Sequence, residues 1–268
     1  MEPVRLAALQ MVSGPVLGPN LEAAARLIAA AAAQGARLAA LPENFYCIGL
    51  RDTDKLAYAE PEGDGPVQRF LSEQAREHRL WLVGGTAPLA ATGPGRVRGA
   101  CLVHDDTGAR RARYDKMHLF RFRAGEERYD ETRTLEAGDA PLAIDSPFGR
   151  LALSVCYDMR FPELYRGLGV FDIAFVPSAF TVPTGAAHWE TILRARAIEN
   201  LAYVVAPAQG GEHPGGRRTW GHTMIIDPWG EVLASQDAGE GVVLADVDPS
   251  RIAGARASLP ALENRRIA

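Results

Sequence analysis

The sequence predicts an α/β protein in which helices and strands alternate and in which parallel and antiparallel strand pairs are mixed. Short apolar runs such as Leu151–Cys156 alternate with helical segments, as they do in layered α/β folds. The last third instead carries strands separated by tight turns, which predicts hairpins. No Ser/Gly linker or shift in composition divides residues 1–268, so we expect one domain, and the element order also fits two similar halves packed sheet on sheet.

The first helix and the strand after it have clear boundary signals. Asn20 can cap a helix over Leu21–Gln34, and Gly35 suits the left-handed position that follows a helix. A strand over Arg37–Pro42 comes next, and Glu43 lies just past its carboxyl end. Glu43 is therefore expected at an edge of the sheet.

The same alternation continues along the chain. A helix opening at Pro66 leads to the strand Leu80–Thr86, and the strands Cys101–His104 and Ala109–Tyr114 flank an Asp-Asp-Thr-Gly turn and form a hairpin. Lys116 then leaves the sheet at a strand end. The other expected elements, in order, are the strands Val4–Gln10 and Leu151–Cys156, the helix Pro162–Leu168, the strand Ile173–Pro177, the helix His188–Asn200, and the strands Ala202–Gln209, His222–Ile226, Glu231–Ala234 and Gly241–Val247.

Composition excludes several classes of partner. The 268 residues carry a net charge of −4 with no basic block, so neither nucleic acid nor an anionic membrane is expected, and a small molecule is the expected partner. Three widely spaced cysteines do not form a secreted disulfide framework and indicate a reducing, cytoplasmic location. The N-terminus enters a strand without an apolar leader, and the Ala-rich stretch Leu21–Ala33 is too short to span a bilayer.

Three residues at strand ends indicate an enzyme with a nucleophilic thiol. Cys156 ends a buried strand, and a thiol with an ordinary pKa near ~8.5 needs a base or a cation before it can attack an unreactive carbonyl. Glu43 can serve as the base, and Lys116 can stabilise the oxyanion that then develops. His118 and His188 lack the close spacing of zinc ligands, so we expect no metal and no organic cofactor.

The segments around these residues resemble the nitrilase superfamily of carbon–nitrogen hydrolases, in its amidase branch. The matching motifs are Leu41-Pro42-Glu43-Asn44, Tyr114-Asp115-Lys116-Met117-His118-Leu119-Phe120 and Ser154-Val155-Cys156-Tyr157-Asp158-Met159-Arg160-Phe161-Pro162-Glu163-Leu164. The resemblance implies a four-layer α-β-β-α sandwich that forms a homodimer or a higher homo-oligomer. It also implies that Glu43 is the general base, Lys116 the oxyanion stabiliser and Cys156 the nucleophile. Glu131 corresponds to the second glutamate of the family, which positions substrate and lysine, and the Tyr157 backbone N–H is expected at the oxyanion.

Further residues are candidates for binding the substrate. Arg160 follows the nucleophile by four positions, and its planar guanidinium can bind a carboxylate through two hydrogen bonds. An ion pair with Asp158 or Glu163 is an equally good reading of Arg160. Phe180 and Thr181 follow a predicted strand, in a place where members of the superfamily line the acyl pocket.

The same resemblance favours an amide substrate over a nitrile. The segments Arg194–Glu199 and Ala208–His213 are most similar to those of amidases that cleave deaminated glutathione to 2-oxoglutarate and Cys-Gly through a thioester acyl-enzyme. Hydrolysis of 2-oxoglutaramate by an omega-amidase is the alternative, and Thr181-Val182-Pro183 departs from the smaller residues expected in the first group. A non-catalytic ligand-binding or scaffold protein of the same fold is a third reading.

Overall fold

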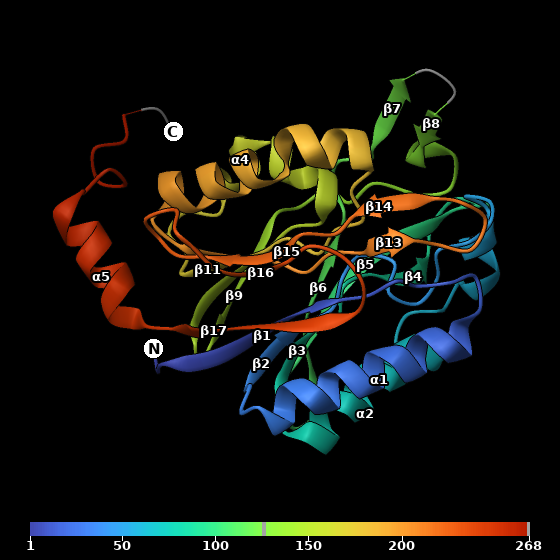
Figure 1. Ribbon diagram of the computed structural model, residues 1–268, viewed down its shortest axis with the longest axis horizontal. Coiled ribbons are helices and arrows are strands. Elements are labelled where there is room, and N and C mark those ends of the chain that lie inside the picture. The colour runs from blue at the N-terminus through green and yellow to red at the C-terminus, as the bar shows by residue number, and fades with distance from the viewer. Residues whose placement is uncertain (125–126, 267–268) are drawn as a thin grey trace.

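The computed structural model describes residues 1–124 and 127–266, which form two mixed sheets packed face to face between two layers of helices (Figure 1). Helices α1 (Leu17–Ala33) and α2 (Pro66–His78) cover the outer face of one sheet. Helices α3 (Pro162–Gly167) and α4 (Val182–Asn200) cover the outer face of the second sheet. The four-layer α-β-β-α sandwich expected from the resemblance is thus confirmed.

The two sheets have the same plan, with parallel strands in the middle and antiparallel strands at the edges. In the first sheet the spatial order is β17 (Gly241–Val247), β1 (Val4–Gln10), β2 (Leu38–Ala40), β3 (Trp81–Val83), β5 (Val97–His104) and β4 (Ala87–Ala90), with β6 (Arg110–Asp115) also paired to β5. In the second it is β16 (Val232–Gln236), β15 (Thr223–Ile226), β12 (Tyr203–Ala206), β11 (Ile173–Phe175), β10 (Gly149–Leu153) and β9 (Leu142–Ser146). Strand β17 returns to the first sheet and pairs with β1 from Val4–Val247 to Gln10–Gly241.

The alternation of side chains in β1 explains how one strand serves two cores. Leu6 and Ala8 point into the core between the sheets, where they join residues of the second sheet such as Leu153. Ala7 and Leu9 point to the other face and pack under α1 and α2. A strand that is buried on both faces is apolar at nearly every position, which is why β1 shows no polar alternation.

Several expected boundaries are wrong in an instructive way. Asn20 does not cap a helix, because α1 begins at Leu17 and the Asn20 amide instead bonds Gly14 and the carbonyl of Tyr46. Helix α4 begins at Val182, six residues before the predicted start, with Pro183 in its first turn. Strand β10 ends at Leu153, and a 3₁₀ helix, η3 (Cys156–Arg160), begins at the thiol.

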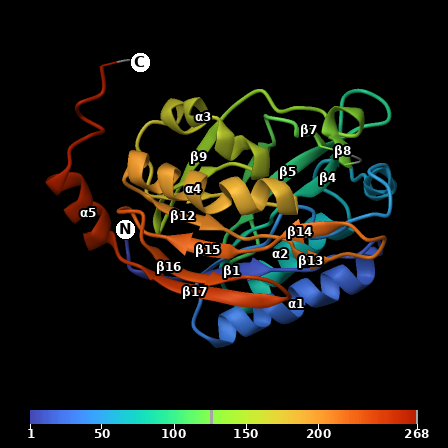
Figure 2. The same ribbon diagram turned by 45° about the horizontal axis from the view of Figure 1, so that its top comes forward.

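Some short elements have no clear signal in the sequence. The hairpins β7–β8 (Arg121–Ala124 and Glu127–Asp130) and β13–β14 (Gly210–Glu212 and Arg218–Trp220) belong to neither large sheet, and β4 and β9 are edge strands. The other elements are α5 (Pro249–Ser258), η1 (Asp54–Tyr58) and η2 (Glu131–Arg133). The β7–β8 hairpin projects from the body of the molecule in Figure 1, and both views place it on the side away from α5 (Figure 2).

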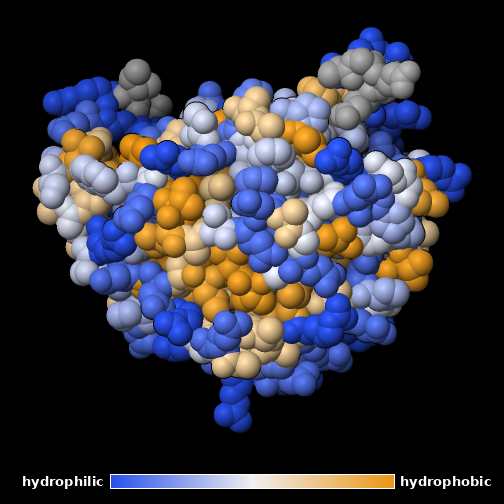
Figure 3. Space-filling model, in the orientation of Figure 1, coloured by the Kyte–Doolittle hydropathy of each residue, from blue (hydrophilic) through white to orange (hydrophobic). Residues whose placement is uncertain are grey.

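Apolar surface gathers on the face of the molecule shown in Figure 3, between α4 and α1 in the orientation of Figure 1. Strands β16 and β17 cross this region, and their residues Val232, Leu233 and Val242 are only partly buried. These two strands are edges of the two sheets, so the surface lies where the sandwich is least covered by helices.

The backbone of Gly85 lies close to that of Pro42, in the short segment between β2 and Glu43. Gly85 has φ +55°, and a Cβ placed on it would overlap the carbonyl of Pro42. We predict that Gly85→Ala lowers the free energy of unfolding by about 3 kcal/mol, since it adds both overlap and left-handed strain. Gly95 has φ +70° and open space around its Cβ position, so Gly95→Ala should cost only about 1 kcal/mol. Urea denaturation measures both, and equal losses would contradict the importance of this contact.

Candidate active site

The structure brings together the three strand-end residues that the sequence singles out. Glu43 follows β2 of the first sheet, Lys116 follows β6 of the same sheet, and Cys156 follows β10 of the second. The Lys116 ammonium donates to Glu43 Oε1 at 2.8 Å. Both side chains are almost wholly buried, at 1% and 4% exposure.

Glu131 is the second carboxylate on Lys116. Its Oε1 and Oε2 atoms lie 2.9 and 2.8 Å from the ammonium nitrogen. Glu131 is held in turn by Phe120, whose backbone N–H donates to Oε2 at 2.7 Å and whose carbonyl accepts from the Glu131 backbone N–H. Lys116 is therefore fixed between two carboxylates that come from different parts of the chain.

Burial and charge act in opposite directions on this cluster. Burial alone would lower the pKa of Lys116, but the charges of Glu131 and Glu43 raise it well above its usual range. Burial would raise the pKa of Glu131, and the charge of Lys116 brings it below its usual value. The two carboxylates thus stabilise Lys116 as a cation.

Cys156 sits in a strained turn between β10 and η3. Its φ of +50° is in the left-handed region, which costs a residue with a Cβ on the order of 1–2 kcal/mol. Its backbone N–H is anchored to the carbonyl of Pro177 at 2.9 Å. Burial and the charge of Glu43 raise the pKa of the Cys156 thiol well above its usual value, against the opposing charge of Lys116. The thiol therefore keeps its proton at rest and needs a base.

A narrow cavity opens at Cys156 and contains three of the predicted substrate-binding residues. Tyr157, Phe180 and Thr181 line it together with the thiol. Its other walls are Phe120, Ala179 and Thr184. Tyr157 lies in the first turn of η3, where backbone N–H groups have no acceptor within the helix, so this donor is available beside the thiol.

Arg160 lies at the rim of this cavity. Its guanidinium carbon is 5.8 Å from the centroid of the Tyr157 ring and 5.5 Å from that of Phe180, and its terminal nitrogens lie 3.3 Å from His188 Nδ1. Within the described chain it makes no ion pair with Asp158 or Glu163, so that reading is wrong. Arg160 instead presents its charge over aromatic rings.

Asp158 is the site residue whose role sequence reasoning missed. Its fully buried carboxylate accepts hydrogen bonds from the Tyr114 hydroxyl (2.7 Å), the Val155 N–H (2.8 Å) and the His118 N–H (2.9 Å), and its Oδ1 lies 2.7 Å from His118 Nδ1. Tyr114 and His118 flank Lys116 in sequence, while Val155 precedes Cys156. Asp158 therefore ties the lysine segment to the thiol turn, and His118 takes part in this link through its backbone N–H and its ring.

The backbone of Glu43 is positioned by polar groups that the sequence alone does not associate with it. The Gln209 amide donates to the Glu43 carbonyl at 3.1 Å and to Ser13 Oγ at 2.9 Å. Asn44, with φ +55°, donates its N–H to Thr86 Oγ1. Gln209 is fully buried and directly follows the apolar run of residues 203–208. A polar residue at the end of such a run was the one signal that the sequence offered.

Metal and membrane signatures are not found in the described chain. Residues 1–124 and 127–266 contain no group of three or more His, Cys, Asp or Glu side chains placed to hold a metal ion. In the same ranges no helix combines the length and the apolar character that crossing a bilayer requires.

Known proteins share this sequence and fold over nearly the whole chain. The model of the carbon–nitrogen hydrolase family matches residues 5–257. A deaminated glutathione amidase of Synechocystis sp. is 43% identical, covering 99% of both chains, and a human omega-amidase is 34% identical, covering 99% of this chain and 96% of its own. The crystal structure of Saccharomyces cerevisiae Nit3, a member of the nitrilase superfamily, superposes with a TM-score of 0.88 at 28% identity, over 99% of this chain and 97% of that one.

The chain belongs to the carbon–nitrogen hydrolase family. It is accordingly an enzyme that hydrolyses carbon–nitrogen bonds, and the Synechocystis and human relatives are amidases, as the resemblance in sequence implied.

The four contacts of Asp158 predict a large effect of its substitution. Asp158→Asn replaces one carboxylate oxygen, which accepts hydrogen bonds, by an NH2 group, which can only donate them. Buried donors then lose their acceptor, so the free energy of unfolding should fall by about 3 kcal/mol. Amide turnover should fall at least ~10-fold, because Cys156 and Lys116 lose their common anchor. Asp145→Asn in the exposed part of β9 is the matched control and should change neither. Urea denaturation and steady-state kinetics measure the effects, and unchanged turnover would contradict the anchoring role.

Proposed function

We propose that the protein hydrolyses a linear amide through a thioester formed on Cys156, with Glu43 as general acid–base and Lys116 as oxyanion stabiliser. One observation carries this proposal. A buried lysine held at 2.8 Å from Glu43 and from Glu131 lies beside a buried thiol that opens into a cavity. The combination supplies a nucleophile, a base and a fixed positive charge in one water-poor site.

In the first half-reaction, Glu43 accepts the thiol proton as sulfur bonds to the amide carbon. The carbonyl π electrons move to oxygen, and the resulting oxyanion is stabilised by the Lys116 ammonium and the Tyr157 backbone N–H. When the intermediate collapses, the carbon–nitrogen bond breaks and Glu43 returns its proton to the leaving amine. Glu131 keeps Lys116 in place and cationic throughout.

In the second half-reaction, water cleaves the thioester. Glu43 takes a proton from the attacking water, the same two donors stabilise the second oxyanion, and the carbon–sulfur bond breaks. The electrons of that bond return to sulfur, which recovers its proton. The raised pKa of Cys156 favours this final protonation and release of the free acid.

The proposed substrate is deaminated glutathione, which would be cleaved to 2-oxoglutarate and Cys-Gly. The full-length relative from Synechocystis sp. with this name, at 43% identity, supports it. Arg160 supports it as well, since its guanidinium lies over Tyr157 and Phe180 at the cavity and can bind the carboxylate of the acyl half.

Hydrolysis of 2-oxoglutaramate is the second candidate, supported by the human omega-amidase at 34% identity. This substrate has the same acyl half but loses ammonia, so it needs no space for a peptide amine. The non-catalytic reading does not agree with membership of this family of enzymes. A scaffold also has no use for a cysteine in a strained backbone conformation beside a buried carboxylate–lysine–carboxylate cluster.

We further propose that the chain is a homodimer in a reducing, cytoplasmic environment. Ile198 and Trp229 are 46% and 60% exposed and lie together at the end of α4, where Arg194 donates to the carbonyl of Gly230. A large apolar pair of this kind suits an interface. The three cysteines are free and buried, which suits a reducing compartment.

Substitution of Glu43 separates thiol reactivity from catalysis. Burial and then Glu43 raise the pKa of Cys156, so Glu43→Gln should lower that pKa and speed the reaction of Cys156 with iodoacetamide at neutral pH. Amide turnover should fall at least ~10²-fold, since no group remains to move the protons.

The exposed Glu163→Gln is the control. Cys47 and Cys101, whose pKa values burial raises to about 11 and about 12, should label equally slowly in all variants. Slower labelling of Cys156 in Glu43→Gln would contradict the charge argument.

Product release with three compounds tests the substrate. We expect wild type to hydrolyse deaminated glutathione faster than 2-oxoglutaramate and a simple nitrile not at all, and Cys156→Ala to be inactive on every one. If the enzyme hydrolyses 2-oxoglutaramate faster, the omega-amidase function replaces cleavage of deaminated glutathione as the proposed function. Retained activity in Cys156→Ala would overturn the thioester mechanism.

A further inference from the structure

A second arginine, Arg217, lies on a segment that adjoins the cavity at Cys156. It immediately precedes β14, and two residues later Thr219 forms an antiparallel bridge with Thr181, which lines the cavity. The next residue, Trp220, donates its N–H to the carbonyl of Phe180 at 2.9 Å. The backbone that carries Arg217 is therefore joined directly to residues that line the cavity.

The side chain of Arg217 stacks at one end of a row of aromatic rings. Its guanidinium carbon is 5.4 Å from the centroid of Tyr129, which lies 5.9 Å from that of Phe120. The ring of Phe120 lies 5.3 Å from that of Tyr157, over which the Arg160 guanidinium stacks. Phe120 and Tyr157 both line the cavity at Cys156. A guanidinium thus stands at each end of an aromatic row that passes the thiol.

The charge of Arg217 is not neutralised locally. In the part of the chain that the structure describes, it makes no ion pair within 4 Å, and its Nε is buried without a hydrogen-bond partner. A buried donor without an acceptor is costly, and proteins retain such a group where a ligand or a water molecule satisfies it.

Lys55 adds a second positive charge at the same end. It lies in η1 and is half-buried, and its charge interacts with those of Glu131, Arg217, Asp52 and Glu43. Burial and then Arg217 lower the pKa of Lys55, and the three carboxylates oppose this shift. Both glutamates already bind Lys116 directly. Asp52 acts on Lys55 as well, but neither Lys55 nor Arg217 forms an ion pair within 4 Å among the described residues, so both can bind a further anion.

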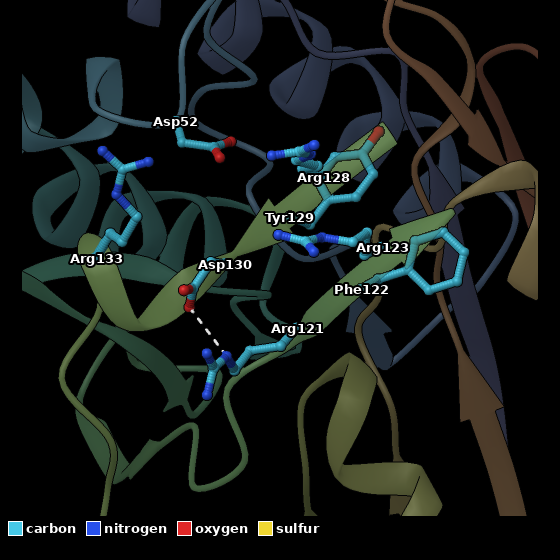
Figure 4. A pocket seen from close by; sticks show the side chains of 8 residues that line it. All are labelled: Asp52, Arg121, Phe122, Arg123, Arg128, Tyr129, Asp130 and Arg133. Atoms are coloured by element: carbon cyan, nitrogen blue, oxygen red, sulfur yellow. Dashed lines mark ion pairs between the residues drawn. The ribbon is translucent and has the colours of Figure 1, made fainter. Parts of the chain in front are cut away.

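The surroundings extend this positive field outward. Among the described residues, a cavity of about 480 Å³ on the β7–β8 hairpin is lined by Arg121, Arg123, Arg128 and Arg133 and by two carboxylates, Asp52 and Asp130 (Figure 4). Tyr129 also borders this cavity, so it adjoins the position of Arg217. An excess of positive charge at an entrance attracts anionic ligands.

We propose that Arg217 and Lys55 bind the carboxylate of the amine half of the substrate, the half released by Cys156. This inference rests on the proposed amide hydrolysis and extends it. With Arg160 on the acyl half, the site would recognise an extended amide that carries a carboxylate at each end, as a dipeptide-like leaving group provides. A substrate that releases ammonia has no partner for Arg217.

The test compares deaminated glutathione with its C-terminal amide, in which the terminal carboxylate is neutral. We expect wild type to favour the free acid by at least ~10-fold in kcat/KM, mainly through KM, because a charge-assisted contact is lost in the amide. Arg217→Gln should lower kcat/KM for the acid to about that of the amide and leave the amide unchanged. Lys55→Met should act in the same direction, and the exposed Arg218→Gln should retain the wild-type preference.

The outcomes separate this inference from the function on which it rests. If wild type hydrolyses both compounds and Arg217→Gln lowers both equally, or if the preference survives in Arg217→Gln and Lys55→Met, Arg217 is a structural residue and the inference is wrong. If wild type hydrolyses only 2-oxoglutaramate, no leaving-group carboxylate exists and the inference is also wrong. If wild type hydrolyses no amide at all, the proposed function itself fails.

Discussion

The buried ammonium of Lys116 is the constraint on which the arrangement of this molecule depends. A charge with 1% of its side chain exposed loses most of its hydration, and only close opposite charges can offset that loss. Glu43 and Glu131 supply them at 2.8 Å each. Glu43 follows β2, Lys116 follows β6 and Glu131 follows the β7–β8 hairpin, so three separate segments must converge on one point. The cost of leaving any one of the charges unpaired holds that convergence in place.

A second buried charge, Asp158, connects this cluster to the thiol. Its carboxylate binds Tyr114 and His118 on one side and the backbone before Cys156 on the other, so the two sheets are joined at the place where chemistry is proposed. The positive φ of Cys156 is sustained by this anchor and by the bond from its N–H to Pro177. The site is therefore preorganised by hydrogen bonds to charged groups rather than by its own local backbone preference.

Around this rigid centre the rim is aromatic and cationic. Tyr157, Phe120 and Tyr129 form a continuous row, and arginines stack on its two ends. Rings of this kind exclude water from the cavity while their faces hold guanidinium groups in place. In the mechanism we propose, the centre carries out the hydrolysis, whereas the rim is where recognition of one particular amide would be decided.

The sequence by itself determined the layered α/β class, the strand-end positions of Glu43, Lys116 and Cys156, and the family, because strand periodicity and short motifs are local properties of the chain. Strand β17 agrees with its predicted bounds for the same reason. Only the tertiary structure decided that Asn20 lies inside a helix and that Asp158 bridges the sheets. It also decided that Arg160 and Arg217 stand at opposite ends of one aromatic row. These facts depend on which residues far apart in sequence pack together, and a buried polar side chain takes whichever partner that packing supplies.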